Sequence, residues 1–115
     1  VLDGGIIAYS NSVKTSVLKV SEKTISKYGA VSENCAREMI NGLEKIFDTE
    51  AMIAVTGIAG PGGASASKPL GLVFIATSYR GRCEVRKYLF GGGRQNVRDR
   101  AAASAINQLK KMILG

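Results

Sequence analysis

The architecture of this chain depends most on residues 51–63, which read Ala51-Met52-Ile53-Ala54-Val55-Thr56-Gly57-Ile58-Ala59-Gly60-Pro61-Gly62-Gly63. The apolar, β-branched residues at the start predict a buried strand over 51–56. The glycines that follow leave backbone N–H groups open to a ligand and permit positive φ angles. Neither a Walker A motif nor a GxGxxG that opens a helix is present. On spacing alone, residues 56–63 therefore fit both an anion or nucleotide site and a plain turn.

Strands and helices on both sides of this stretch complete an α/β pattern. The sequence predicts a strand over 4–9, a short helix around 13–18, and a helical turn that Ser21 caps and Gly29 ends. Ser32 is the predicted N-cap of a stronger helix. Strands over 72–77 and 83–90 follow the glycines, and a helix over 94–114 ends the chain. The short turn 79–82 predicts an antiparallel hairpin, and mixed polarity over 83–90 is typical of an edge strand.

Apolar residues recur at helical spacing in the two longer helices, so we expect each helix to bury one face. In the helix after Ser32 these residues are Ala36, Met39, Ile40, Leu43, Ile46 and Phe47. In the last helix they are Val97, Ala101, Ala105, Leu109 and Met112, joined by Ile106 and Ile113.

The segment between strands 4–9 and 51–56 is long enough for a helical crossover, so we expect these two strands to be parallel. Their carboxyl ends would then share one edge of the sheet, where open α/β sheets bind ligands. Tyr9, Ser10 and Lys14 would converge there with residues 56–63. A lysine made less basic by its surroundings can act as general base to a serine. On spacing alone, a strand-end tyrosine and a surface lysine of a helix are the favoured explanation of the same residues.

The amino-acid composition excludes some kinds of catalytic and metal site. The 115 residues contain no histidine, which excludes a His-based triad or a Cys/His zinc site within this chain. The two cysteines, Cys35 and Cys83, lack CxxC spacing and fit buried free thiols of a cytoplasmic protein. No run of apolar residues is long enough to span a membrane.

Charge is divided unevenly along the chain. Residues 1–50 carry six Lys/Arg against seven Asp/Glu, and residues 51–115 carry ten against two, which gives −1 and +8 and a total of +7. This balance fits an anionic partner or a solvated basic face. Lys68 could reach a phosphate. Arg94 and Arg98 oppose the dipole of the helix they begin, which favours a bound anion or an acidic neighbour such as Asp99. The usual nucleic-acid signatures are absent, so we do not expect a nucleic-acid partner.

Taken together, three ordered motifs resemble one family. They are Gly4-Gly5-Ile6-Ile7-Ala8-Tyr9-Ser10-Asn11 with Lys14, Tyr28-Gly29-Ala30-Val31-Ser32-Glu33 with Ala36, and Thr56–Gly63 with Lys68-Pro69-Leu70-Gly71. The chain resembles the C-terminal domain of the competence/damage-inducible protein CinA, whose active members are nicotinamide-nucleotide amidases of the PncC type. The resemblance runs from Val1 to near Gly115.

The resemblance implies a three-layer α/β/α fold with a mixed, mostly parallel sheet. It also implies that nicotinamide mononucleotide is hydrolysed to nicotinic acid mononucleotide and ammonia, without a cofactor or metal. Lys14 would take the proton of a serine nucleophile, and Tyr9 would position or relay it. The expected substrate-binding residues are Ser10, Asn11, Thr56, Gly57, Ile58, Ala59, Gly60, Pro61, Gly62, Lys68 and Arg94. Our own hypothesis is that the glycine loop stabilises the oxyanion and that Lys68 or Arg94 holds the phosphate.

Two departures from the family pattern matter. The serine of the family lies in a Gly-Ser-Ser-like segment that would fall before Val1, and Ser10 and Ser12 come too late to match it. We therefore expect one domain over 1–115 that lacks its N-terminal segment. The alternative function is a catalytically silent nucleotide-binding domain with a regulatory role in competence or damage response. The second departure is Lys19, where the family usually has glycine. We further expect a cytoplasmic homo-oligomer.

Overall fold

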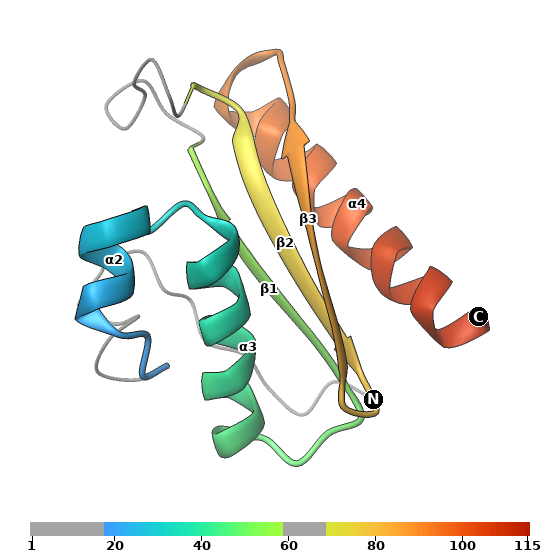
Figure 1. Ribbon diagram of the computed structural model, residues 1–115. Coiled ribbons are helices and arrows are strands. Elements are labelled where there is room, and N and C mark those ends of the chain that lie inside the picture. Colours follow the sequence, from blue (N-terminus) through green and yellow to red (C-terminus); the bar gives the residue numbers. More distant parts are fainter. Residues whose placement is uncertain (1–17, 59–68) are drawn as a thin grey trace.

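A computed structural model describes residues 18–58 and 69–115 of the chain. Along these residues the elements are α2 (Glu22–Tyr28), α3 (Glu33–Ile46), β1 (Ala51–Gly57), β2 (Leu72–Tyr79), β3 (Arg82–Leu89) and α4 (Gly93–Leu114) (Figure 1). The strand predicted over 4–9 lies outside the described residues, as does nearly all of the short helix expected around 13–18. In the part of the chain that is described, no helix is long and apolar enough to cross a membrane.

Both predicted N-caps are confirmed. The Ser21 hydroxyl accepts a hydrogen bond from the Lys23 N–H (3.2 Å), and the Ser32 hydroxyl accepts one from the Cys35 N–H (3.1 Å). Ser32 also donates to the Gly29 carbonyl (2.9 Å), so one side chain joins the end of α2 to the start of α3. Each cap satisfies a backbone N–H that has no partner within its helix.

The three described strands form one sheet in the order β1-β2-β3, with antiparallel pairing throughout. The expected mostly parallel sheet is not supported by these strands, because the connection from β1 to β2 brings the chain straight back beside itself instead of crossing over. Arg80 (φ 50°) and Gly81 (φ 83°) form the two-residue turn between β2 and β3. Two successive positive φ angles suit the twist of a tight hairpin.

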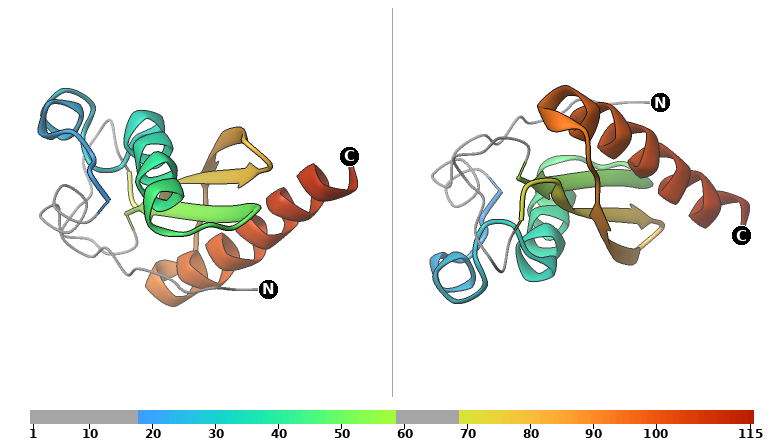
Figure 2. Two further views of the ribbon diagram at one scale, coloured as in Figure 1. Left: turned by 90° about the horizontal axis from the view of Figure 1, so that it is seen from below. Right: turned by 90° about the horizontal axis from the view of Figure 1, so that it is seen from above.

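The sheet separates two helical layers, which gives the predicted three-layer α/β/α arrangement (Figure 2). On one face of the sheet, Ala54 and Ala76 pack in a cluster with Ile40 of α3. On the other face, Val73 and Ile75 pack with Val97, Ala101 and Ala105 of α4. Consecutive residues of β2 therefore enter opposite cores, as the two-residue period of a strand requires.

The buried face of α4 differs from the predicted one. Ile106 is 64% exposed and Ile113 is 45% exposed, whereas Gln108 is only 3% exposed. At 100° per residue, Gln108 lies in line with Val97, and the two isoleucines point to the outer flank of the helix. Ile46, in the last turn of α3, was also predicted to be buried and is 45% exposed. Apolar character alone therefore misplaced part of each helix face.

Candidate functional site

The two ends of the glycine loop are held together by backbone hydrogen bonds. The loop leaves β1 after Gly57, and its return to β2 is fixed by hydrogen bonds from the Ile58 N–H to the Leu72 carbonyl (2.8 Å) and from the Gly71 N–H to the Ile58 carbonyl (2.7 Å). Residues 59–68 of the loop, including the predicted Ala59, Gly60, Pro61, Gly62 and Lys68, lie outside the described residues. Where the loop begins and ends is thus determined by the sheet itself.

Gly71 ties this base to the next strand. Its carbonyl accepts a hydrogen bond from the Phe90 N–H (2.9 Å), and its φ is +92°. A Cβ at position 71 would lie only 1.8 Å from the Phe90 carbonyl oxygen. Both the dihedral angle and the lack of space therefore require glycine here. Through this residue the loop base contacts the chain just before α4.

Thr56 joins the second motif to the third. Its side-chain hydroxyl, in a residue that is 4% exposed, donates to the Ala30 carbonyl (2.7 Å) in the connection between α2 and α3. Two segments 26 residues apart in the chain meet by this bond at the carboxyl end of β1. The hydroxyl of Thr56 thus holds the end of β1 against the connection between α2 and α3.

Space at the start of the loop is limited. A Cβ at Gly57 would lie 2.8 Å from Val73 Cγ2, and the Ile58 side chain is buried. Of the predicted substrate-binding residues in this stretch, Gly57 therefore offers only its backbone, whereas both backbone groups of Ile58 are already hydrogen-bonded to the return of the loop. Backbone N–H groups are the donors that an oxyanion or phosphate needs at such a place.

Arg94 lies at the same end of the sheet as the loop base, in the first turn of α4 (Figure 1). The N-cap Gly92 provides no side-chain cap and the first turn contains no acidic residue. The ion pairs between described residues include neither Arg94 nor Arg98. The expected partner, Asp99, instead accepts a hydrogen bond from Gln95 Nε2 (2.9 Å). Arg94 is thus left exposed at this edge.

The other predicted site residues, Tyr9, Ser10, Asn11 and Lys14, lie outside the described residues, and their convergence with the loop stays a prediction. Among the described residues, no group of three or more His, Cys, Asp or Glu side chains could hold a metal ion. Both cysteines are free thiols, as predicted, and Cys35 is buried as expected, whereas Cys83 is only half-buried. Burial raises the pKa of the Cys83 thiol, and the nearby Arg37 charge acts in the opposite direction.

Sequence reasoning missed two residues that organise this edge. Ala30 contributes only its carbonyl oxygen, which no sequence pattern identifies as an acceptor. Gly71 was visible as the last residue of the Lys68-Pro69-Leu70-Gly71 segment. Its contact with Phe90 depends on the hairpin register, which the sequence alone does not give.

These features define a three-layer α/β/α domain whose glycine loop opens at the carboxyl end of β1. The chain belongs to the CinA C-terminal domain family, which matches residues 1–113.

Several known proteins are similar to it. A CinA-like protein of Thermotoga neapolitana is 46% identical over 108 residues, which covers 94% of this chain and 26% of that protein. A putative competence-damage inducible protein of Clostridium beijerinckii is 42% identical over 110 residues, which covers 96% of this chain and 27% of that protein. The chain thus spans about a quarter of the length of the curated relatives it matches.

Solved structures give the same assignment. The competence damage-inducible protein A of Klebsiella pneumoniae superposes with a TM-score of 0.87 at 33% identity, covering 92% of this chain and 66% of that one. The competence/damage inducible protein CihA of Agrobacterium tumefaciens gives a TM-score of 0.81 at 38% identity, covering 93% and 64%. The recognition of the family from the three motifs is therefore confirmed.

Proposed function

We propose that this chain is the catalytic domain of an amidase that converts nicotinamide mononucleotide to nicotinic acid mononucleotide and ammonia. The observation that carries the proposal is the hydrogen bond between Thr56 and Ala30, which holds the second and third family motifs together at the base of the glycine loop. Membership in the CinA C-terminal domain family, over residues that include Tyr9 and Lys14, supports the same assignment.

The proposed reaction is acyl transfer to a serine followed by hydrolysis. Lys14 takes the proton of the serine hydroxyl as its oxygen attacks the carboxamide carbon, and the proton passes to the leaving ammonia. Tyr9 positions or relays that proton. Water then cleaves the acyl-enzyme. We expect the serine in the segment before Val1, so the reaction belongs to the full-length protein, which we propose to be a cytoplasmic homo-oligomer.

Negative charge develops on the carbonyl oxygen of the substrate as the serine attacks. Hydrogen-bond donors that stabilise this charge must already be in place. We assign this role to the backbone N–H groups of the glycine loop, whose base is fixed by the Ile58 and Gly71 hydrogen bonds. We assign the substrate phosphate to Arg94 or Lys68. Arg94 is the better supported of the two, because it is exposed at this edge and has no acidic partner among the described residues.

The test measures ammonia and nicotinic acid mononucleotide released from nicotinamide mononucleotide by the full-length protein. Lys14→Ala should reduce kcat by about 100-fold or more, because a positioned general base contributes about 10²–10⁴. Lys45→Ala is the matched control, since Lys45 lies in the last turn of α3, at the opposite end of that helix from Ser32. It should keep activity within about twofold.

Three outcomes would contradict all or part of the proposal. If the wild-type protein releases no ammonia, the chain is not an amidase of this substrate. If it binds nicotinamide mononucleotide without turnover, the catalytically silent nucleotide-binding domain is the correct alternative. If Lys14→Ala retains full activity, the assigned base is wrong even though the reaction class stands.

A further inference from the structure

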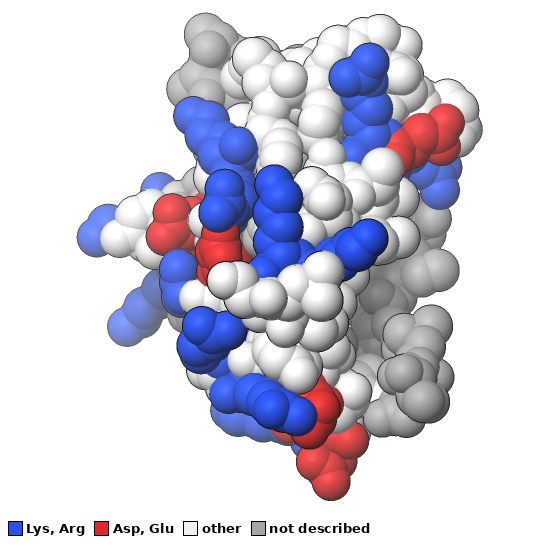
Figure 3. Space-filling model, turned by 90° about the vertical axis from the view of Figure 1, so that its right-hand side faces the viewer, with Lys and Arg blue, Asp and Glu red and all other residues white. Residues whose placement is uncertain are grey.

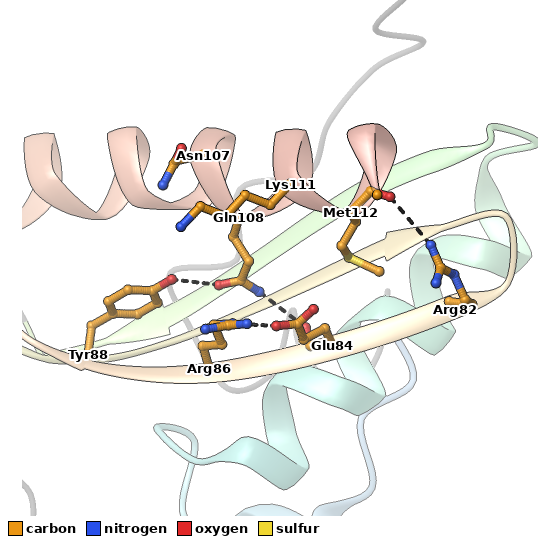
Figure 4. A pocket seen from close by; sticks show the side chains of 9 residues that line it. Arg82, Glu84, Arg86, Tyr88, Asn107, Gln108, Lys111 and Met112 are labelled. Carbon is orange, nitrogen blue, oxygen red and sulfur yellow. Dashed lines mark hydrogen bonds and ion pairs between the residues drawn. The ribbon is translucent and has the colours of Figure 1, made fainter.

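A groove of about 290 Å³ lies between β3 and the second half of α4 (Figure 4). Its β3 wall consists of the side chains of Arg82, Glu84, Arg86 and Tyr88, and its α4 wall includes Gln108 and Lys111. The groove shares no residue with the candidate site at the glycine loop. It is thus a second concave surface of the domain with its own chemistry.

Charge in this groove is predominantly positive. Three cationic side chains, Arg82, Arg86 and Lys111, face one carboxylate side chain, Glu84, which forms an ion pair with Arg86. Arg82 donates to the Met112 carbonyl (3.4 Å) and so offsets the negative end of the α4 dipole. Lys111 has no ion-pair partner among the described residues. Figure 3 shows that Lys and Arg side chains predominate on the side of the molecule that carries α4.

The floor of the groove is a buried polar network that fixes its walls. Gln108 Nε2 donates to the Ile75 carbonyl (3.0 Å), the Thr77 hydroxyl (2.9 Å) and the Glu84 carbonyl (3.2 Å). Its Oε1 accepts a hydrogen bond from the Tyr88 hydroxyl (2.8 Å). This one side chain therefore holds α4 against two strands, and the cations extend from rigid elements on both sides. Such preorganisation lowers the entropic cost of binding.

The chemistry of the walls determines the class of ligand. The donors available to a ligand come from guanidinium and ammonium groups, because the Tyr88 hydroxyl already donates to Gln108 Oε1. Glu84 repels a single anion, but a ligand with several negative charges can contact both walls and outweigh that repulsion. The volume lies at the small end of ligand sites, which suits a compact anion.

We propose that this groove binds a compact polyanion with a di- or triphosphate chain, at a site separate from the amidase site. Lys111 contacts the chain from α4, and Arg86 and Arg82 contact it from β3. Glu84 lowers the affinity and restricts the site to multiply charged ligands. The phosphate chain is the shared feature of free polyphosphates and of nucleoside triphosphates.

The experiment measures binding of inorganic tripolyphosphate to the full-length protein by titration calorimetry at low salt. Lys111→Gln should weaken binding by about tenfold, as expected for the loss of one charge-assisted contact. Lys110→Gln is the matched control, because this neighbouring lysine carries the same charge but does not line the groove. It should change the affinity by less than about twofold.

A second pair of variants tests the opposite change, a gain in affinity for tripolyphosphate. Glu84→Gln should tighten binding severalfold, since it removes the one carboxylate side chain of the described groove and releases Arg86. Asp99→Asn removes an equal charge from α4 outside the groove and should leave the affinity unchanged. ATP serves as a second probe. Binding equal to that of tripolyphosphate assigns the site to the phosphate chain, and tighter binding adds the nucleoside.

Three results would overturn the proposal. The first is the absence of saturable tripolyphosphate binding. The second is equal weakening by Lys110→Gln and Lys111→Gln, which would indicate a diffuse basic surface. The third is binding of a short DNA duplex that both lysine variants weaken equally while tripolyphosphate does not bind. That result would assign the face to nucleic acid instead.

Discussion

Gly71→Ala should destabilise this domain by about 3–4 kcal/mol. A positive φ costs a residue with a Cβ about 1–2 kcal/mol. The new Cβ would also lie 1.8 Å from the Phe90 carbonyl oxygen, so the backbone must move. Movement strains two hydrogen bonds, Gly71 N–H to Ile58 and Phe90 N–H to Gly71, each worth about 1 kcal/mol.

Gly81→Ala separates the two contributions. Gly81 has a similar φ of +83°, but nothing lies within 4 Å of a Cβ built on it. This variant should cost only the dihedral term of about 1–2 kcal/mol. Urea unfolding of the full-length protein, with amide hydrogen exchange to assign the transition to β1–β3, measures both variants.

The same experiment can refute this reasoning. Equal destabilisation by the two variants would mean that the close approach of Gly71 to Phe90 contributes nothing. Gly71→Ala should also reduce the proposed amidase activity at temperatures where the domain stays folded, because it displaces the base of the glycine loop. Gly81→Ala, in the hairpin turn between β2 and β3, should not.

Three further predictions concern other parts of the domain. Gln108→Leu should destabilise it by about 2–4 kcal/mol in urea unfolding, because it leaves buried groups on two strands without their partner; a loss below 1 kcal/mol would contradict the network. Lys19→Gly should stabilise it by about 0.5–1 kcal/mol in the same assay, since Lys19 adopts a φ of +61° that glycine accepts without strain. Cys83 should be alkylated by iodoacetamide more slowly than an exposed thiol at pH 7.5, because its raised pKa lowers the thiolate fraction, and the rate should increase with pH. Peptide mass spectrometry should find Cys35 unlabelled in the folded protein, and rapid labelling of it would contradict the burial.

Local signals predicted most of the described elements. Ser21 and Ser32 mark helix starts because their hydroxyls satisfy N–H groups within two or three residues, so the information is contained in a short window. The hairpin between β2 and β3 follows from the same kind of signal, since its turn needs residues that accept positive φ. These features depend little on distant parts of the chain.

The predictions that failed concern residues whose burial depends on their packing partners. Ile106 and Ile113 are apolar, but they lie about half a turn around α4 from Val97 and so point away from the described strands. Gln108 is polar, but its position on the helix places it over the sheet, where backbone carbonyls supply its partners. Residue type predicted neither outcome, because the direction of α4 across the sheet decides which face is covered.

The candidate site could also be predicted only in part. The glycine loop could be recognised from its composition, and its proposed role came from the resemblance of three motifs to one family. The hydrogen bond from Thr56 to Ala30 and the contact of Gly71 with Phe90 could not be recognised, since each pairs a side chain or Cα with the backbone of a remote segment.

β2 contributes alternate residues to two separate cores, and this determines how the sequence of the domain can change. Val73 and Ile75 belong to the α4 cluster, whereas Ala76 belongs to the α3 cluster. Insertion of one residue within β2 would exchange the two sets and place each in a cavity shaped for the other. Evolution can therefore vary the length of the chain outside the paired strands, but along β2 it is limited to size-matched exchanges at nearly every consecutive position.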